Sequence, residues 1–335
     1  MNLSDFYFEL PDSLIAQYPT DRRSFSRLLV VDKQSGKVEH RRFLDIGDYL
    51  KAGDVIVFNN TKVVKARLFG KRKSGGKLEL LVFKDFEQNC YLMLVKGNVK
   101  DGEEIIVGDF KIKLLHLQEG LFKTDLDDVN YNELVTKYGK VPLPPYIKRQ
   151  ASELDEVRYQ TVFGSIDGAV AAPTAALHFD DELIGMLKFK GVDIVQITLH
   201  VGVGTFLPVK SENVSEHKML PEFYEIGEMA AKKINEAKRE RRKIVFCGTT
   251  TVRAVESSAK NGFVVAGQGK ADIFIYPGYK FKVVDCMLTN FHLPKSTPLF
   301  LVSALIGREK LLDIYKEAIQ EGYRFFSYGD AMLII

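Results

Sequence analysis

The stretch Asp54-Val55-Ile56-Val57-Phe58-Asn59-Asn60-Thr61-Lys62-Val63 decides how the chain is divided. Its first five residues predict a buried strand, and two asparagines and a threonine end that strand abruptly. From Val63 to Ile147 the pattern changes to short alternating runs joined by glycine-containing turns, which is typical of a small antiparallel β-barrel. If a barrel interrupts the chain here, residues before Val63 must pair with strands that come after Lys148.

Helices and strands alternate on either side of this stretch, which predicts an α/β layout for the rest of the chain. The run Pro142-Leu143-Pro144-Pro145 marks the return from the barrel, because proline fits neither a central strand nor a helix interior. The expected strands are Leu28–Asp32, Val38–Phe43, Asp54–Phe58, Val192–Thr198, Lys243–Cys247 and Phe281–Asp285, and the expected helices are Asn130–Tyr138, Asp180–Lys188 and Glu222–Arg239.

We therefore predict a mixed α/β (α+β) main domain, discontinuous in sequence, with an inserted small antiparallel β-barrel domain. Residues 1–62 form the first segment of the main domain, residues 63–147 the barrel, and residues 148–335 the second segment. The second segment is expected to carry most of the active site, because polar and turn-forming residues concentrate there.

The composition is ordinary for a globular protein, with 335 residues, 46% hydrophobic and 27% charged, and a formal net charge of +3. No apolar run approaches the roughly 20 residues that a membrane helix needs. The first residues, Met1 to Phe6, include an acid where a secretory leader has basic residues. We expect a cytoplasmic protein with no membrane contact, and a monomer.

Five stretches in the second half mix histidine, threonine, asparagine and arginine with glycine and proline. Burying such polar groups without partners costs about 2 kcal/mol each, so we expect these stretches to line a polar cleft. The stretches are APTAALHF (172–179), TLHVGVGTF (198–206), CGTTTVRAVES (247–257), TNFHLPKSTPLF (289–300) and YRFFSYGDAM (323–332).

The third of these stretches begins where a strand ends and a helix is expected to start. Thr249, Thr250 and Thr251 can present hydroxyls and backbone N–H groups to an anion there, and Arg253 and Glu256 follow on one face of the helix. For any single threonine, simple capping of the helix is the better interpretation. Three in a row favour ligand binding.

The other stretches supply histidines in settings that allow two interpretations. His178 and His200 can each be structural donors, and His200 precedes a Gly-x-Gly pair that is too short for a dinucleotide fingerprint. Asn290, His292 and Lys295 lie in a proline-interrupted loop, where functional residues are common. No metal signature, Gly-x-Ser-x-Gly elbow or phosphate-binding P-loop occurs, which leaves proton transfer and the binding of a polar, nucleotide-like molecule.

Basic residues are concentrated between Thr61 and Lys77, a stretch that contains no acid. This run fits a solvated strand face and hairpin tip as well as it fits a surface that faces phosphates.

Over essentially its whole length the chain resembles the S-adenosylmethionine:tRNA ribosyltransferase-isomerases of queuosine biosynthesis. The resemblance is carried by SDFYFELPDSLIAQYP, SRLLVVD, HRRF, VFNNTKVVKARLFG, PLPPYIKR, RYQTVF and the five stretches above, ending in SYGDAMLI. It implies an α/β domain with an inserted β-barrel. It also implies transfer and isomerisation of the ribosyl part of S-adenosylmethionine onto 7-aminomethyl-7-deazaguanine at the tRNA wobble position, which gives epoxyqueuosine-tRNA, adenine and methionine.

The implied reaction needs a base for a proton on the sulfonium-activated ribose and an acid for the adenine leaving group. S-adenosylmethionine is then a co-substrate, with no other cofactor and no metal expected. The candidates for proton transfer are His178, His200, His292, Asp285 and Asp330. The candidates for substrate binding are Pro173, Thr174, Gly202, Gly204, Thr205, Thr249, Thr250, Thr251, Arg253, Glu256, Asn290 and Tyr328. The candidates for tRNA binding are Lys62, Arg67, Lys71, Arg72, Lys73, Lys148, Arg149 and Lys295.

Three positions depart from the family pattern: Leu220 stands where a second histidine is usual, Ala176 where glycine is usual, and Pro298 where leucine is usual.

Two other functions compete with the implied one. A methyltransferase would release S-adenosylhomocysteine, but the glycine-rich strand-to-helix loop common in that class is missing. A non-catalytic RNA-binding protein would use the barrel alone, and would leave the polar residues outside the barrel unexplained.

Overall fold

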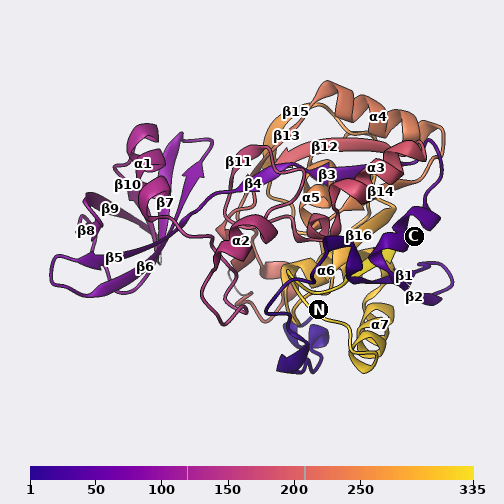
Figure 1. Ribbon diagram of the computed structural model, residues 1–335, viewed down its shortest axis with the longest axis horizontal. Coiled ribbons are helices and arrows are strands. Elements are labelled where there is room, and N and C mark those ends of the chain that lie inside the picture. The colour runs from indigo at the N-terminus through magenta and orange to yellow at the C-terminus, as the bar shows by residue number, and fades with distance from the viewer. Residues whose placement is uncertain (119, 207–208) are drawn as a thin grey trace.

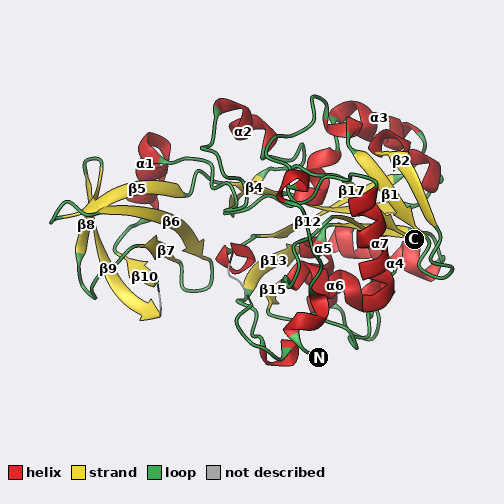
Figure 2. Cartoon of the chain, turned by 90° about the horizontal axis from the view of Figure 1, so that it is seen from below, coloured by secondary structure: helices red, strands yellow, loops and turns green. Residues whose placement is uncertain are grey.

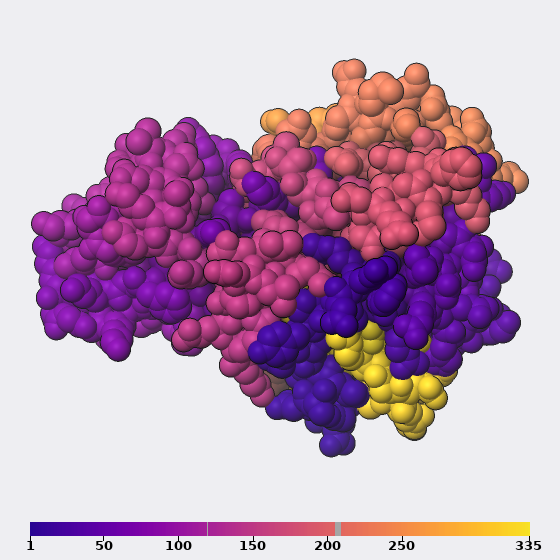
Figure 3. Space-filling view, in the orientation of Figure 1, coloured from indigo at the N-terminus to yellow at the C-terminus, as the bar shows by residue number. Residues whose placement is uncertain are grey.

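The computed structural model describes residues 1–118, 120–206 and 209–335, and it divides the chain into two lobes joined by a narrower waist (Figures 1 and 3). The smaller lobe is a closed barrel and the larger lobe is built on a mixed sheet. This architecture confirms the predicted fold class. The boundaries at residues 63 and 147 stay a prediction.

The large lobe contains a sheet in which the segment before the barrel is central. The strand β3 (Val55–Asn59) runs parallel to both β12 (Asp193–Leu199) and β14 (Ile244–Cys247). The strand β1 (Arg27–Val31) runs parallel to β17 (Ala331–Ile334) near the C-terminus. Residues before the barrel therefore pair with strands after it, as predicted. The spatial order is β15 (Gly267–Ala271), β13 (Glu222–Ile226), β12 (Asp193–Leu199), β3 (Val55–Asn59), β14 (Ile244–Cys247), β16 (Cys286–Asn290), β17 (Ala331–Ile334), β1 (Arg27–Val31) and β2 (Val38–Arg42).

Helices cover both faces of this sheet (Figure 2). The helices α4 (Glu228–Arg239), α5 (Thr249–Ser258), α6 (Thr297–Ile306) and α7 (Arg308–Gln320) pack on one face, and α3 (Asp181–Phe189) packs on the other. Helix α4 shows why: Ala231, Ile234 and Ala237 form its buried stripe, and most of its other residues are charged. None of the helices in the described part of the chain is long and apolar enough to cross a membrane.

Short 3-10 turns complete the large lobe. They are η1 (Leu3–Phe6), η2 (Asp12–Leu14), η3 (Arg23–Phe25), η4 (Phe43–Tyr49), η5 (Thr174–His178), η6 (Val203–Phe206) and η7 (Val214–Glu216).

The small lobe encloses a core of its own, to which every other residue contributes in strands such as β8 (Glu104–Val107) and β10 (Leu121–Thr124). Leu68, Leu80, Val82 and Met93 are among the side chains that fill it, and helix α1 (Asp128–Tyr138) packs Leu134 against them. Around the barrel the order is β10 (Leu121–Thr124), β7 (Cys90–Lys96), β6 (Lys77–Asp85), β5 (Arg67–Arg72), β8 (Glu104–Val107) and β9 (Phe110–Gln118). Between the lobes, β4 (Thr61–Val63) pairs with β11 (Ile166–Ala169), and α2 (Glu153–Arg158) follows the proline run.

Two predicted elements are wrong. The expected helix Glu222–Arg239 is a strand up to Ile226 and a helix only from Glu228, because Tyr224 and Ile226 are buried between β12 and β15. The expected strand Phe281–Asp285 is not a strand, because the carboxylate of Glu256 accepts the backbone N–H groups of residues 282–284. The strand β16 starts only at Cys286.

A stacked pair of rings joins the barrel to the large lobe. Phe86, between β6 and β7, stacks on His200 with ring centroids 4.2 Å apart and an interplanar angle of 5°. Gly168 makes room for both rings: a Cβ atom there would lie 2.6 Å from Phe86 and 2.7 Å from His200, and its φ is +145°. The stack therefore depends on a glycine at this position.

We expect Gly168→Ala to lower the free energy of unfolding by about 2 kcal/mol more than Gly267→Ala does, because forced overpacking costs about 1–3 kcal/mol. Gly267 has a similar φ of +137° but open space around it, so its variant measures the backbone strain alone. Urea unfolding of the two variants checks the difference. Equal losses would mean that the rings move aside freely.

Candidate functional site

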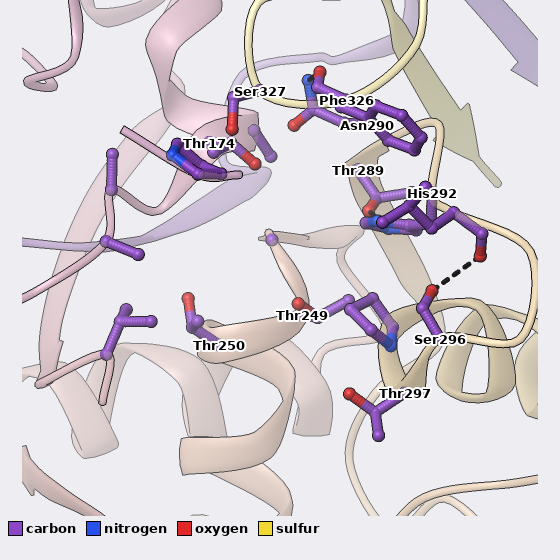
Figure 4. A pocket seen from close by; sticks show the side chains of 18 of the residues that line it. Thr174, Thr249, Thr250, Thr289, Asn290, His292, Ser296, Thr297, Phe326 and Ser327 are labelled. Atoms are coloured by element: carbon purple, nitrogen blue, oxygen red, sulfur yellow. Dashed lines mark hydrogen bonds between the residues drawn. The ribbon is translucent and has the colours of Figure 1, made fainter. Parts of the chain in front are cut away.

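A cavity of about 460 Å³ lies where β14 and β16 end. In open α/β sheets ligands commonly bind outside the carboxyl ends of the parallel strands, and β3, β14 and β16 end together here. The polar side chains that line it come from distant segments (Figure 4). They include Tyr146, Tyr159, Thr174, Thr249, Thr250, Thr289, Asn290, His292, Lys295, Ser296, Thr297 and Ser327.

Two of the three consecutive threonines face this cavity. Thr249 and Thr250 line it at the N-terminus of α5, just after Gly248, whose φ of +89° lets the chain turn from strand to helix. The Thr250 hydroxyl accepts a hydrogen bond from Nδ2 of Asn59 at 3.3 Å. Thr251 points away, because its hydroxyl donates to the carbonyl of Cys247 at 2.6 Å. The side chain of Thr251 is thus not placed to bind a ligand in this cavity.

Asn290 is buried in the cavity wall with one unsatisfied atom. Its Nδ2 group donates to Nε2 of His178 at 3.0 Å and to the carbonyl of Phe326 at 3.2 Å. Its Oδ1 atom has no partner among the described residues. Since buried acceptors are almost always satisfied, Oδ1 marks a place where a ligand N–H or O–H group can bind.

His178 lies behind Asn290, not in the cavity. Nε2 accepts from Asn290, so the ring proton is on Nδ1 and is donated to the hydroxyl of Ser26 at 2.7 Å. Burial, with Arg324 and Arg23 nearby, lowers the pKa of His178 to about 3. The ring is therefore neutral, and it orients Asn290 from outside this cavity.

His292 is the histidine that lines the cavity among the described residues. Its Nε2 atom lies 2.7 Å from the hydroxyl of Thr289, and its backbone N–H donates to Tyr315 at 3.0 Å. Burial lowers the pKa of His292 to about 3, so the ring is neutral at pH 7. No hydrogen bond occupies Nδ1 within the described part of the chain, so this atom is open to a ligand.

His200 belongs to a second, smaller cavity of about 190 Å³ at the junction of the lobes, together with Gly202 and Gly204. Nδ1 of His200 lies 2.9 Å from the hydroxyl of Thr61, and burial lowers its pKa to about 4. His200 and His292, which were expected in one cleft, therefore line different cavities. The side chain of Thr205 lies outside the described part of the structure.

Neither predicted carboxylate reaches the cavity. Asp285 precedes β16, at the opposite end of that strand from His292, and it is exposed and paired with Lys33. Asp330 is buried and accepts the backbone N–H groups of Arg27 and Arg324 at 2.9 and 2.8 Å. No Asp or Glu is among the described residues that line the cavity, so neither predicted carboxylate is placed for proton transfer there.

Three predicted binding residues hold the fold together instead. Arg253 is buried and forms an ion pair with Glu222, and Glu256 binds the backbone at 282–284. The hydroxyl of Tyr328 donates to the buried Asp155 at 2.7 Å. Nε of Arg253 has no partner among the described residues, but none of the three side chains lines the cavity.

Most of the predicted tRNA-binding cations are in ion pairs. The buried Asp155 accepts two hydrogen bonds from Arg149, at 2.6 and 2.7 Å. Lys71 is exposed, and Lys295 lines the cavity with its ammonium 5.1 Å from the ring centre of Tyr7. The remaining pairs are Lys62 with Asp167, Arg67 with Glu79, Arg72 with Glu103, Lys73 with Glu104, and Lys148 with Asp12.

Several residues of the cavity wall were not predicted from the sequence. Tyr146 lies directly after the proline run, and its hydroxyl is 2.6 Å from that of Ser327. Tyr159 is buried and its hydroxyl has no partner among the described residues. Aromatic residues beside a rigid proline segment could have suggested Tyr146, whereas nothing in the sequence around Tyr159 distinguishes it from core.

The chain is similar to known proteins over its full length. A family model described as "Queuosine biosynthesis protein" matches residues 3–334. Proteins named S-adenosylmethionine:tRNA ribosyltransferase-isomerase from Vesicomyosocius okutanii and Acetivibrio thermocellus are 46% and 47% identical, across 100% of this chain and 98% and 100% of theirs. The crystal structure of S-adenosylmethionine tRNA ribosyltransferase from Thermotoga maritima is 35% identical, with a TM-score of 0.59, across 99% of this chain and 100% of that one.

Proposed function

The chain belongs to the queuosine biosynthesis protein family, and from this premise we propose that it is an S-adenosylmethionine:tRNA ribosyltransferase-isomerase. The observation that carries this proposal is the full-length identity of about 46% to proteins of that name. S-adenosylmethionine is the co-substrate and tRNA the acceptor. The finer part of the proposal is the acceptor base, 7-aminomethyl-7-deazaguanine at the wobble position, with epoxyqueuosine-tRNA, adenine and methionine as products.

We assign S-adenosylmethionine to the cavity at the end of β14 and β16. A volume of about 460 Å³ is within the range of small-molecule sites. The N-terminus of α5, with Thr249 and Thr250, suits the methionine carboxylate, because helix N-termini attract anions. The free Oδ1 atom of Asn290 suits an N–H or O–H group of the nucleoside. Pro173 and Thr174 border the same space.

We assign proton transfer to His292. It is neutral, it lines the cavity, and its Nδ1 atom is unoccupied within the described residues, whereas His178 is occupied on both ring nitrogens. A neutral imidazole can take a proton from the sulfonium-activated ribose and return it to a leaving group. Tyr146 is a weaker candidate, since burial raises its pKa to about 12.

We assign tRNA binding to exposed cations of both lobes. Lys71 and Lys77 stand opposite each other on β5 and β6. Lys62, Lys73 and Lys148 are in surface pairs, which contribute about 0–1 kcal/mol and can exchange a carboxylate for a phosphate. Arg149 is excluded, because its partner Asp155 is fully buried. A monomer in the cytoplasm, where tRNA is modified, belongs to the same proposal.

Incubation with S-adenosylmethionine and tRNA that carries the aminomethyl base tests the proposed function. We expect adenine and methionine to be released in equal amounts, measured by chromatography, with a matching gain in tRNA mass. Unmodified guanine at the wobble position should give no adenine. S-adenosylhomocysteine as product would establish a methyltransferase, and tRNA binding without any product would leave an RNA-binding protein.

A further inference from the structure

Two arginines share a small cavity beside the proposed substrate site. Arg23 of η3 and Arg158 of α2 line it together with Thr20, His178 and Ser327. Ser327 lines the larger cavity as well. The two spaces therefore meet at one side chain.

Neither arginine has an ion-pair partner within the described residues, and each binds backbone carbonyls instead. Arg23 donates to Leu177 at 3.1 Å and to Val157 at 2.9 Å. Arg158 donates through Nη1 to Asp21 at 3.1 Å, while its Nε group is buried without a partner. A guanidinium has five N–H donors, so donors remain on both side chains.

The positive charge at this cavity is incompletely compensated. Burial lowers the pKa of both arginines, and the charge of Arg158 lowers that of Arg23 further. Tyr328, Asp180 and Asp181 oppose the shift of Arg23, and Tyr328 and Asp21 oppose that of Arg158. No Asp or Glu lines the cavity among the described residues. Two half-buried guanidinium groups that line one cavity offer several N–H donors to an anion with several oxygens.

We propose that Arg23 and Arg158 bind a backbone phosphate of the tRNA next to the nucleotide being modified. This inference rests on the proposed function. A base in the larger cavity has its sugar and phosphate within reach of the smaller one, because Ser327 borders both. Phosphate contacts of this kind fix the position of a nucleic acid while the base enters the pocket.

The variant Arg158→Gln tests the proposal, because Arg158 donates to a single carbonyl, whereas Arg23 ties two segments together. We expect the KM for tRNA to rise about 10-fold, with kcat at saturating tRNA and the Kd for S-adenosylmethionine unchanged within about twofold. The plot of log binding constant against log salt should become shallower by about 0.7, the slope for one phosphate on a single strand.

Arg22→Gln is the matched control. Arg22 is next to Arg23 in the sequence, is exposed and lies over the ring of Phe25, but it does not line the cavity. The Arg22→Gln variant removes the same charge without removing a phosphate contact, so the salt slope of this variant should match that of the wild type. Equal effects of the two variants on tRNA binding would overturn the proposal. A loss of S-adenosylmethionine affinity in Arg158→Gln would overturn it too, by assigning the pair to the methionine carboxylate.

The effect of inorganic phosphate on the Tm tests the anion site independently of the proposed enzymatic activity. At constant ionic strength, phosphate should raise the Tm of the wild type and of Arg22→Gln but not that of Arg158→Gln. If this holds while the wild type releases no adenine with tRNA, the anion site stands and the proposed activity fails. If adenine is released while phosphate protects all three proteins equally, the activity stands and the assignment of the two arginines is wrong.

Discussion

Replacing His292 by glutamine is expected to lower kcat for adenine release about 1,000-fold, because general acid–base catalysis contributes about 100- to 10,000-fold. Glutamine can keep the hydrogen bond that Nε2 makes to Thr289, but it cannot carry a proton. The Kd for S-adenosylmethionine should stay within about threefold of wild type, because the loss affects the transition state and not the bound substrate. Single-turnover measurements with isothermal titration check both values.

His40→Gln is the control for this prediction. His40 also forms two side-chain hydrogen bonds, to Tyr323 and Glu317 at 2.9 and 3.1 Å, but it lies on the edge strand β2 and does not line the cavity. Its variant should retain wild-type kcat. If His292→Gln keeps more than about a tenth of the wild-type rate, proton transfer must pass to another group in the wall, and Tyr146 is then the first to replace.

The division into two lobes could be predicted because it depends on local patterns. The asparagines after β3, the strand-and-turn texture from Val63 and the proline run at 142–145 are each visible within about ten residues. Pairing of β3 with β12 and β14 then follows from chain connectivity. The strand β13 was missed because its alternation covers five residues and leads directly into the stripe of α4.

The candidate site could be predicted only in part, because burial and partner choice are decided by residues far away in sequence. Glu256 is bound by the backbone at 282–284, and Arg253 by Glu222, 31 positions away. In the sequence both look like charged groups free to bind a ligand. Four residues of the cavity wall could be predicted because strand ends beside glycine or proline place them at the edge of the sheet. They are Thr249, Thr250, Asn290 and His292.

Acidification from pH 8 to pH 5 is expected to lower the free energy of unfolding by about 6 kcal/mol through three buried histidines. Burial lowers the pKa values of His178 and His292 to about 3, and that of His200 to about 4, from 6.5. The unfolded chain therefore binds three protons below pH 6.5 that the folded protein cannot accept until about pH 4 to 3. Stability is retained above pH 6.5 and is lost as the pH falls through this window.

At pH 5 each ring contributes about 2 kcal/mol of this loss, since 1.5 pH units below 6.5 correspond to that free energy. Urea unfolding at pH 8, 6 and 5 measures it. His200→Gln should remove about a third of the difference between pH 8 and pH 5, whatever it does to stability at either pH. His116→Gln, exposed on the barrel, should leave the difference unchanged. A wild-type protein equally stable at pH 8 and pH 5 would mean that the three rings gain water or a counter-charge when protonated, and that the hydrogen bonds to Ser26, Asn290, Thr61 and Thr289 do not hold them neutral.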